Sequence, residues 1–196
     1  MKLQRSHYAV FFSIVLGAFL LFIAFSSGYY PVALVDFSFI WAKDISYPYY
    51  AAVVYRSLSV SENNSQEYPL FTPSSPLELR VVNLNELINQ KLIAAANRAL
   101  LPADELRTRL DEVAHRAEQN NRAFALAQNF FNMTQQEFRT YVLDPRAERE
   151  VLRAELAKRG ITFDDWLRAE KQHHRIWIFS SRLYWDGERV RFVTEE

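Results

Sequence analysis

The apolar and polar residues divide this chain into one unbroken apolar run and a longer stretch with helical periodicity. From Ser6 to Val35 there is no Asp, Glu, Lys or Arg, and Tyr8 to Phe25 is almost entirely apolar. A helix of that length rises about 27 Å, close to the hydrocarbon thickness of a bilayer. The run therefore predicts a transmembrane helix, and Lys2 and Arg5 before it favour a cytoplasmic N-terminus.

A cleaved signal peptide is the alternative interpretation of this run, since small residues follow Phe22 and a cleavage site needs them. The apolar core is long for a signal peptide, which favours an uncleaved signal anchor. We therefore expect residues 1–30 to form a cytoplasmic tip and membrane anchor. Residues 31–196 are then an extracytoplasmic domain in which the bulk of the chain lies outside the cytoplasm.

The chain after the anchor alternates between strand and helix patterns. Pro31 to Ile40 alternates and is rich in β-branched and aromatic residues, which predicts a short strand. Pro48 to Leu58 has a helical period, and Ser59 to Ser74 has the composition of a loop.

Two helices with apolar faces are predicted next. Ser75 caps the first, whose stripe consists of Leu77, Val81, Leu84, Ile88, Leu92, Ala95 and Ala99. The second follows Pro102 and places Leu106, Leu110, Val113 and Ala117 on one face. Because their connection is short, we expect these helices to be antiparallel neighbours.

A capped and interrupted helix occupies the segment from Phe130 to Leu156. Thr134 and Glu137 have the spacing of a capping box, and Pro145 predicts an interruption near Asp144. Gly160 is placed to end the helix.

The C-terminal segment combines a capped helix with strands. Thr162 and Asp165 begin the helix, and Arg175 to Trp185 is a strand-like run. Asp186-Gly187 predicts a two-residue hairpin turn. The fold class is thus mainly α, with a small antiparallel sheet made from the N-terminal strand and the C-terminal hairpin.

Three of these segments resemble the N-terminal chaperone domain of the SurA-like foldases. The first reads T-x-x-E-F-x-x-x-V from Thr134, followed by a proline and L-x-x-x-L; the others surround Asp36 and Trp166. Asn132 and Met133 stand where the family usually has Gly-Trp. Asn tolerates a left-handed backbone nearly as well as glycine.

The resemblance implies that a C-terminal helix and strand return to complete the N-terminal domain. We therefore expect the chain near Ile176 to pair with the strand at Val32 to Val35. Family members are often fused to parvulin-type prolyl isomerase domains of about 90–100 residues, the size of a small domain. The segment after Gly160 is too short for one, so the resemblance implies a chaperone domain without a parvulin domain and no enzyme.

Composition removes several other function classes. Acidic and basic residues balance at 23 each, so the basic excess of a nucleic-acid binder is missing. The chain has no cysteine, which excludes disulfides and thiolate sites. His173 and His174 are adjacent and point apart on a helix, so solvated helix-end histidines are favoured over a zinc site. We expect no catalytic residues, no metal and no cofactor.

The function expected from the residues and the resemblance is the binding of unfolded or newly exported polypeptides through apolar contacts. Most aromatic residues near the capped helix are expected in the core, and some could line a groove. The candidate peptide-binding residues are Phe124, Phe130, Phe131, Met133, Phe138, Tyr141 and Trp166. A structural subunit that docks one fixed partner in an envelope complex and a prolyl isomerase-related foldase remain alternatives.

Overall fold

The computed structural model describes residues 2–45, 75–118 and 121–193, with side chains throughout except at residues 2–9, 24, 117–118, 121–123, 126 and 130. The predicted helix from Pro48 to Leu58 and the loop from Ser59 to Ser74 lie outside the described residues. The described elements are α1 (Lys2–Ser26), β1 (Pro31–Val35), β2 (Ser38–Trp41), η1 (Ala42–Asp44), α3 (Pro76–Leu100), α4 (Ala103–Glu118), α5 (Asn121–Phe131), α6 (Gln135–Phe138), η2 (Arg139–Leu143), α7 (Asp144–Lys158), α8 (Phe163–His173), β3 (Ile176–Ile178), β4 (Leu183–Trp185) and β5 (Val190–Phe192). The fold is mainly helical with a small antiparallel sheet, as the sequence predicts.

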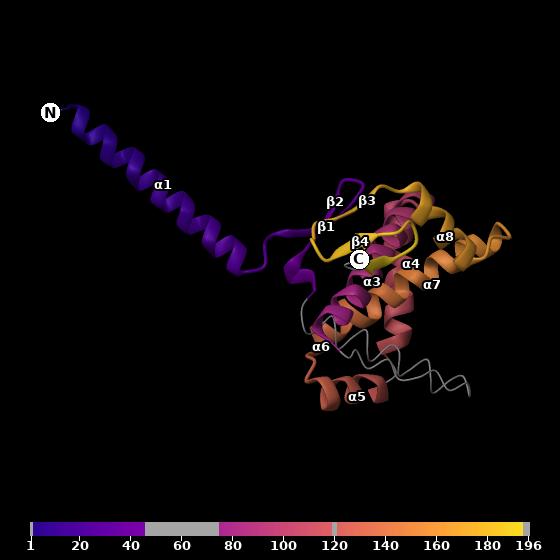
Figure 1. The fold of residues 1–196 in the computed structure, drawn as a ribbon. Coiled ribbons are helices and arrows are strands. Elements are labelled where there is room, and N and C mark those ends of the chain that lie inside the picture. The colour runs from indigo at the N-terminus through magenta and orange to yellow at the C-terminus, as the bar shows by residue number, and fades with distance from the viewer. Residues whose placement is uncertain (1, 46–74, 119–120, 194–196) are drawn as a thin grey trace.

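The first helix, α1, projects away from the other elements (Figure 1). Its large apolar side chains from Val10 to Phe25 are exposed wherever they are described. The sequence predicts that Tyr8 to Phe25 crosses a membrane within this helix. In the part of the chain that the structure describes, however, no helix combines the length and the apolar character that a membrane span requires.

The segment predicted as a single N-terminal strand is a β-hairpin. β1 and β2 pair antiparallel, with Val35 opposite Ser38, so that Asp36 and Phe37 form the turn. Asp36 has a φ of +51°, a left-handed conformation that Asp tolerates better than most residues. Alternation holds within β1, where Ala33 and Val35 are buried, but its phase changes across the turn, since Phe37 is exposed and Ile40 is the next buried residue.

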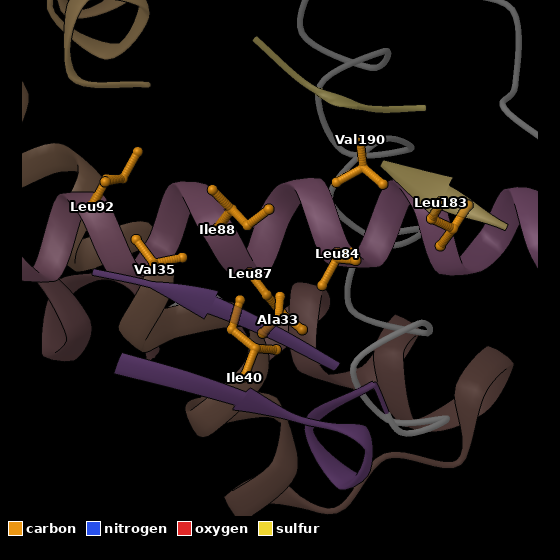
Figure 2. Close-up of a cluster of buried hydrophobic side chains, with 9 residues drawn as sticks. All are labelled: Ala33, Val35, Ile40, Leu84, Leu87, Ile88, Leu92, Leu183 and Val190. Carbon is orange, nitrogen blue, oxygen red and sulfur yellow. The ribbon is translucent and has the colours of Figure 1, made fainter. Parts of the chain in front are cut away.

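The core lies between this hairpin and one face of α3. Ala33, Val35 and Ile40 point inward from the strands, and Leu84 and Ile88 meet them from the helix. Figure 2 shows the strands on one side of α3, with Leu183 and Val190 of the C-terminal hairpin on another. The N-terminal strands and the C-terminal hairpin therefore both pack on α3 and belong to one core.

The C-terminal segment closes the sheet as expected. β3 pairs antiparallel with β1, placing Ala33 opposite Ile178 and Val35 opposite Ile176, in a sheet of order β2-β1-β3. This confirms the predicted pairing between the chain near Ile176 and the strand at Val32 to Val35.

The run from Arg175 to Trp185 is divided into β3 and β4, and β4 pairs with β5 in a separate two-stranded sheet. The hairpin turn is shifted by one residue from the prediction. Asp186 stands before the two central residues, because its N–H donates to the carbonyl of Arg189 at 3.1 Å. Its carboxylate accepts from the N–H groups of Glu188 at 2.9 Å and Arg189 at 2.7 Å. Gly187 is the first central residue and has a φ of +101°. On α3, Asn85 accepts a hydrogen bond from the N–H of Val190 at 2.8 Å.

A side-chain clasp between Asp36 and the end of α8 reinforces the closure. The Asp36 carboxylate accepts from the N–H of Arg175 at 3.0 Å and contacts Nδ1 of His174. Nε2 of His174 lies 2.8 Å from a carboxylate oxygen of Glu170. Burial acts to lower the pKa of His174, but the hydrogen bonds with Asp36 and Glu170 outweigh it and raise the pKa. His174 thus sits between two carboxylates, whereas exposed His173 fits the expectation of a solvated helix end.

The helices pack differently from the prediction. α4 packs chiefly against α7, and α7 in turn packs against α3. The short connection at Leu101 and Pro102 does not make α3 and α4 close neighbours, because α7 takes the apolar face of α4. The helix ends follow the sequence: Ser75 accepts from the N–H of Glu78 at 3.1 Å, and Thr162 accepts from that of Asp165 at 3.3 Å.

Candidate functional site: a cavity between α4 and α7

Five of the seven predicted peptide-binding side chains gather in one apolar cluster around α6. Met133 and Phe138 are buried in it, and the rings of Phe124 and Phe138 lie 5.6 Å apart. The cluster side chains that were predicted for peptide binding are Phe124, Phe131, Met133, Phe138 and Tyr141. Burial of this kind serves packing, and a role of these side chains in peptide binding stays a prediction.

The remaining two predicted residues lie elsewhere. Trp166 on α8 packs against the core formed by α3 and the strands, and also against the cluster of Leu152 and Leu156. Phe130 belongs to α5, but its side chain is outside the described part of the chain.

The turn before α6 forms as the sequence implies. Asn132 has a φ of +50°, so Asn occupies the left-handed position without glycine. Thr134 accepts from the N–H of Glu137 at 3.2 Å and its own N–H donates to the Glu137 carboxylate at 2.9 Å. This is the predicted capping box, and it fixes where the helix begins.

The interruption predicted at Pro145 is a π-helical turn, η2, between α6 and α7. The N–H of Asp144 donates to the carbonyl of Arg139, five residues earlier. Proline has no N–H to donate to the carbonyl of the residue four positions earlier. The wider π-helical turn accommodates the loss of that hydrogen bond. Arg139 and Asp144, at the two ends of this turn, both reach the cavity described next.

The cavity lies between α4 and the start of α7 and has a volume of about 730 Å³. Its apolar lining consists of Leu101, Ala103, Leu106, Leu110, Ala114 and Ala147. Charged residues complete it, namely Arg98, Arg107, Asp111, Arg139, Asp144 and Glu148. The arrangement, an apolar floor with charges of both signs, is typical of sites that bury apolar groups and orient them through polar ones.

The charged lining is partly fixed by contacts among its own members. Arg139 forms ion pairs with Asp111 at 3.5 Å and with Asp144 at 3.8 Å, which connects η2 to α4 across the cavity. Burial raises the pKa of Glu148; Asp144 adds to this rise, and Arg98 opposes it. The backbone carbonyl of Glu148 accepts from the buried Asn97 of α3 at 2.9 Å.

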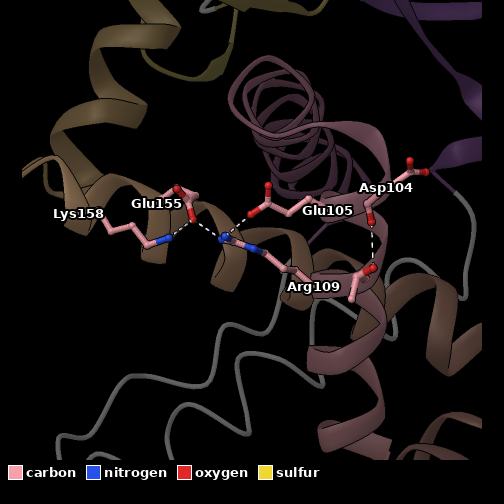
Figure 3. A network of polar contacts seen from close by, with 6 residues as sticks. Asp104, Glu105, Arg109, Glu155 and Lys158 are labelled. Atoms are coloured by element: carbon pink, nitrogen blue, oxygen red, sulfur yellow. Dashed lines mark hydrogen bonds and ion pairs between the residues drawn. The ribbon is translucent and has the colours of Figure 1, made fainter.

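An ionic network joins α4 to the later part of α7. Arg109 contacts the carboxylates of Glu105 and Glu155, and Lys158 lies 2.6 Å from Glu155 (Figure 3). Hydrogen bonds from Lys158 and Arg109 lower the pKa of Glu155, a buried residue of α7. The network therefore links α4 to α7.

The cavity residues were not singled out from the sequence as a site. The available signal was the face of Leu106 and Leu110, which the periodicity predicts correctly. That face was assigned to packing against α3, and the tertiary arrangement leaves part of it open toward α7 instead. The cavity therefore lies beside α4, and of the residues predicted for peptide binding whose side chains the structure describes, none is in its lining.

Among residues 2–45, 75–118 and 121–193, no group of three or more His, Asp or Glu side chains is arranged to hold a metal ion. Comparison of the chain with protein-family models, with curated proteins and with solved structures gives no match.

Proposed function

We propose that this protein binds apolar segments of unfolded or newly exported polypeptides in the α4–α7 cavity, as a SurA-like chaperone without a parvulin domain. The observation that carries the proposal is the open, apolar-floored cavity of about 730 Å³. Ligand sites usually have volumes of about 300–1,000 Å³, so the cavity has room for several side chains of an incoming segment.

The expected strength of binding follows from the apolar floor. Burying one large apolar side chain contributes about 1.5–3 kcal/mol. Two such side chains contribute about 3–6 kcal/mol before the cost of ordering the segment, which corresponds to affinities of millimolar to tens of micromolar. Weak, exchanging binding of this kind suits a protein that must release its clients, and it requires no nucleotide.

The proposal includes attachment to a membrane through α1. Its support is the uncharged run from Ser6 to Val35, the exposure of the apolar side chains of α1, and the projection of α1 from the domain. Lys2 and Arg5 favour a cytoplasmic N-terminus and an extracytoplasmic domain. In this arrangement the cavity meets exported chains beside the membrane.

The experiment is aggregation of an unfolded test protein, followed by light scattering, with the full chain supplied in lipid nanodiscs. Wild-type protein at about 100 μM, comparable with or above the tighter affinities given above, is expected to suppress scattering. Ala103→Trp places an indole at the exposed start of α4, over the cavity, and is expected to reduce suppression. Glu112→Trp adds the same group at an exposed position of α4 outside the cavity lining and is the matched control.

No suppression at molar excess would contradict the proposal, as would equal activity of the two tryptophan variants. Recovery of one stoichiometric partner, with no effect on unrelated unfolded proteins, would favour a structural subunit instead.

A further inference from the structure

The outer face of the small sheet carries a row of exposed aromatic side chains. Leu34 lies opposite Phe39 on one side and opposite Trp177 on the other, so these three residues share the face away from α3. Phe39 is 43% exposed and Trp177 61%. Phe37 at the hairpin turn is 99% exposed and Phe179 after β3 is 49% exposed. We call Phe39, Trp177 and Phe179, together with Phe37 at the adjoining turn, the aromatic sheet face.

The aromatic sheet face is not needed by the core. The inward side chains of the same strands, Ala33, Ile40 and Ile178, already pack toward α3. Large exposed apolar side chains gathered on one surface mark an interaction site more often than isolated ones do. We therefore expect another molecule to cover the aromatic sheet face.

Its position in the chain points to a lipid surface. Only residues 27–30 separate α1 from β1, so the sheet is the first part of the domain after the apolar helix (Figure 1). Tyr29 and Tyr30 lie in this connection, and the Tyr30 ring stacks on Phe25 of α1 at 5.8 Å. Trp and Tyr are the residues that gather where a membrane meets water.

The charges around the face fit anionic headgroups. Lys43 follows β2, Arg175 precedes β3 and Arg182 precedes β4, and all three are exposed. Lys43 lies 3.9 Å from the centre of the Tyr29 ring. Two acids lie nearby: Asp36, whose carboxylate contacts His174, and Asp44, whose carboxylate accepts from the N–H of Trp41 at 2.9 Å. Exposed cations beside aromatic groups are typical of surfaces that contact anionic lipid.

We propose that the aromatic sheet face lies in the headgroup region of the bilayer and docks the domain against the membrane. The inference rests on the membrane attachment within the proposed function and adds an orientation to it. With the sheet on the lipid, α3 stands between the membrane and the C-terminal hairpin, and the α7–α8 turn points away from it.

Because the chain has no cysteine, single-cysteine variants give unique labels. Phe37→Cys and Phe179→Cys report on the aromatic sheet face, and Leu16→Cys reports on α1. Ile161→Cys, exposed between α7 and α8, is the control. Figure 1 shows the turn that joins these two helices at the opposite side of the domain from β1 and β2. Each full-length variant carries a spin label in vesicles of equal parts phosphatidylcholine and phosphatidylglycerol. Accessibility to oxygen, which concentrates in lipid, is compared with accessibility to a water-soluble nickel chelate.

The expected result is an oxygen-to-nickel ratio several-fold higher at positions 37, 179 and 16 than at position 161. The ratios at 37 and 179 should fall in vesicles of phosphatidylcholine alone, since anionic headgroups are then absent. A low oxygen-to-nickel ratio at positions 37 and 179, with a high ratio at position 16, overturns the docking but leaves the membrane attachment standing. Shielding of 37 and 179 from both reagents shows a protein occupant and also overturns it. A low oxygen-to-nickel ratio at position 16 contradicts both the membrane attachment and the docking.

Discussion

Val190 on β5 gives a direct test of whether the C-terminal hairpin belongs to the core. Its side chain is 2% exposed and packs with the cluster on α3 (Figure 2). Replacing Val190 by Ala removes two carbon atoms, worth about 1.6 kcal/mol at about 0.8 kcal/mol per buried CH₂. The cavity left behind adds to this, so we expect a loss of about 2 kcal/mol in the free energy of unfolding.

The assay is thermal and urea unfolding of the full chain in a mild nonionic detergent, followed by tryptophan fluorescence. A loss of about 2 kcal/mol lowers the Tm of a domain of this size by about 4–8 °C. Val193→Ala is the matched control, because Val193 follows the same strand but is 49% exposed. It should change stability by less than about 0.5 kcal/mol. Equal small shifts for both variants would refute the reasoning that the tail completes the core.

Three further changes test the clasp and two helix ends. The raised pKa of His174 means that its stabilisation is complete below the unfolded value of 6.5 and is lost as pH rises through the higher folded pKa. Urea midpoints of the wild type should fall over that range, and His174→Gln should remove this dependence; a fall of the same size in the variant would contradict the assignment. Thr134→Ala removes the acceptor of the Glu137 N–H and should cost about 1 kcal/mol in urea unfolding, whereas no change would mean that the cap is dispensable. Gly160 ends α7 with a φ of +70°, a conformation that strains a residue with a Cβ atom. Gly160→Ala should therefore lower the free energy of unfolding by about 1 kcal/mol, and an unchanged urea midpoint would contradict this.

Local signals in the sequence predicted the helix ends well, because capping depends on neighbouring residues. Ser75, Thr134 and Thr162 all cap the helices assigned to them. Gly160 closes α7 as expected, with its N–H donating to Ala157 and that of Ile161 to Leu156.

The pairing of β3 with β1 was predicted from the family resemblance and not from local pattern. Nothing in the periodicity of Ile176 to Ile178 names its partner strand, which lies far away in the chain. The turn at Asp36 was missed because polar and apolar residues continue to alternate through it in the sequence. The role of Asp36 is visible only in the structure, where its carboxylate contacts His174 and accepts from the N–H of Arg175.

The cavity could not be predicted because it depends on which helix covers the apolar face of α4. Leu106 and Leu110 were placed on one face correctly, but their partner is α7 and the contact is incomplete. Asn97 falls outside the predicted apolar stripe, yet it is buried where its side chain meets the carbonyl of Glu148. A hydrogen bond between distant segments leaves no periodic signal in a single sequence.

Site-specific crosslinking from the cavity tests the proposed function most directly. A photoreactive group on Ala103→Cys lies at the cavity, and the same group on Glu112→Cys lies on exposed α4 outside it. With several unrelated unfolded polypeptides, the account predicts crosslinks from position 103 and few from position 112. Equal crosslinking from both positions, or none from position 103 while aggregation is still suppressed, would contradict binding in the cavity.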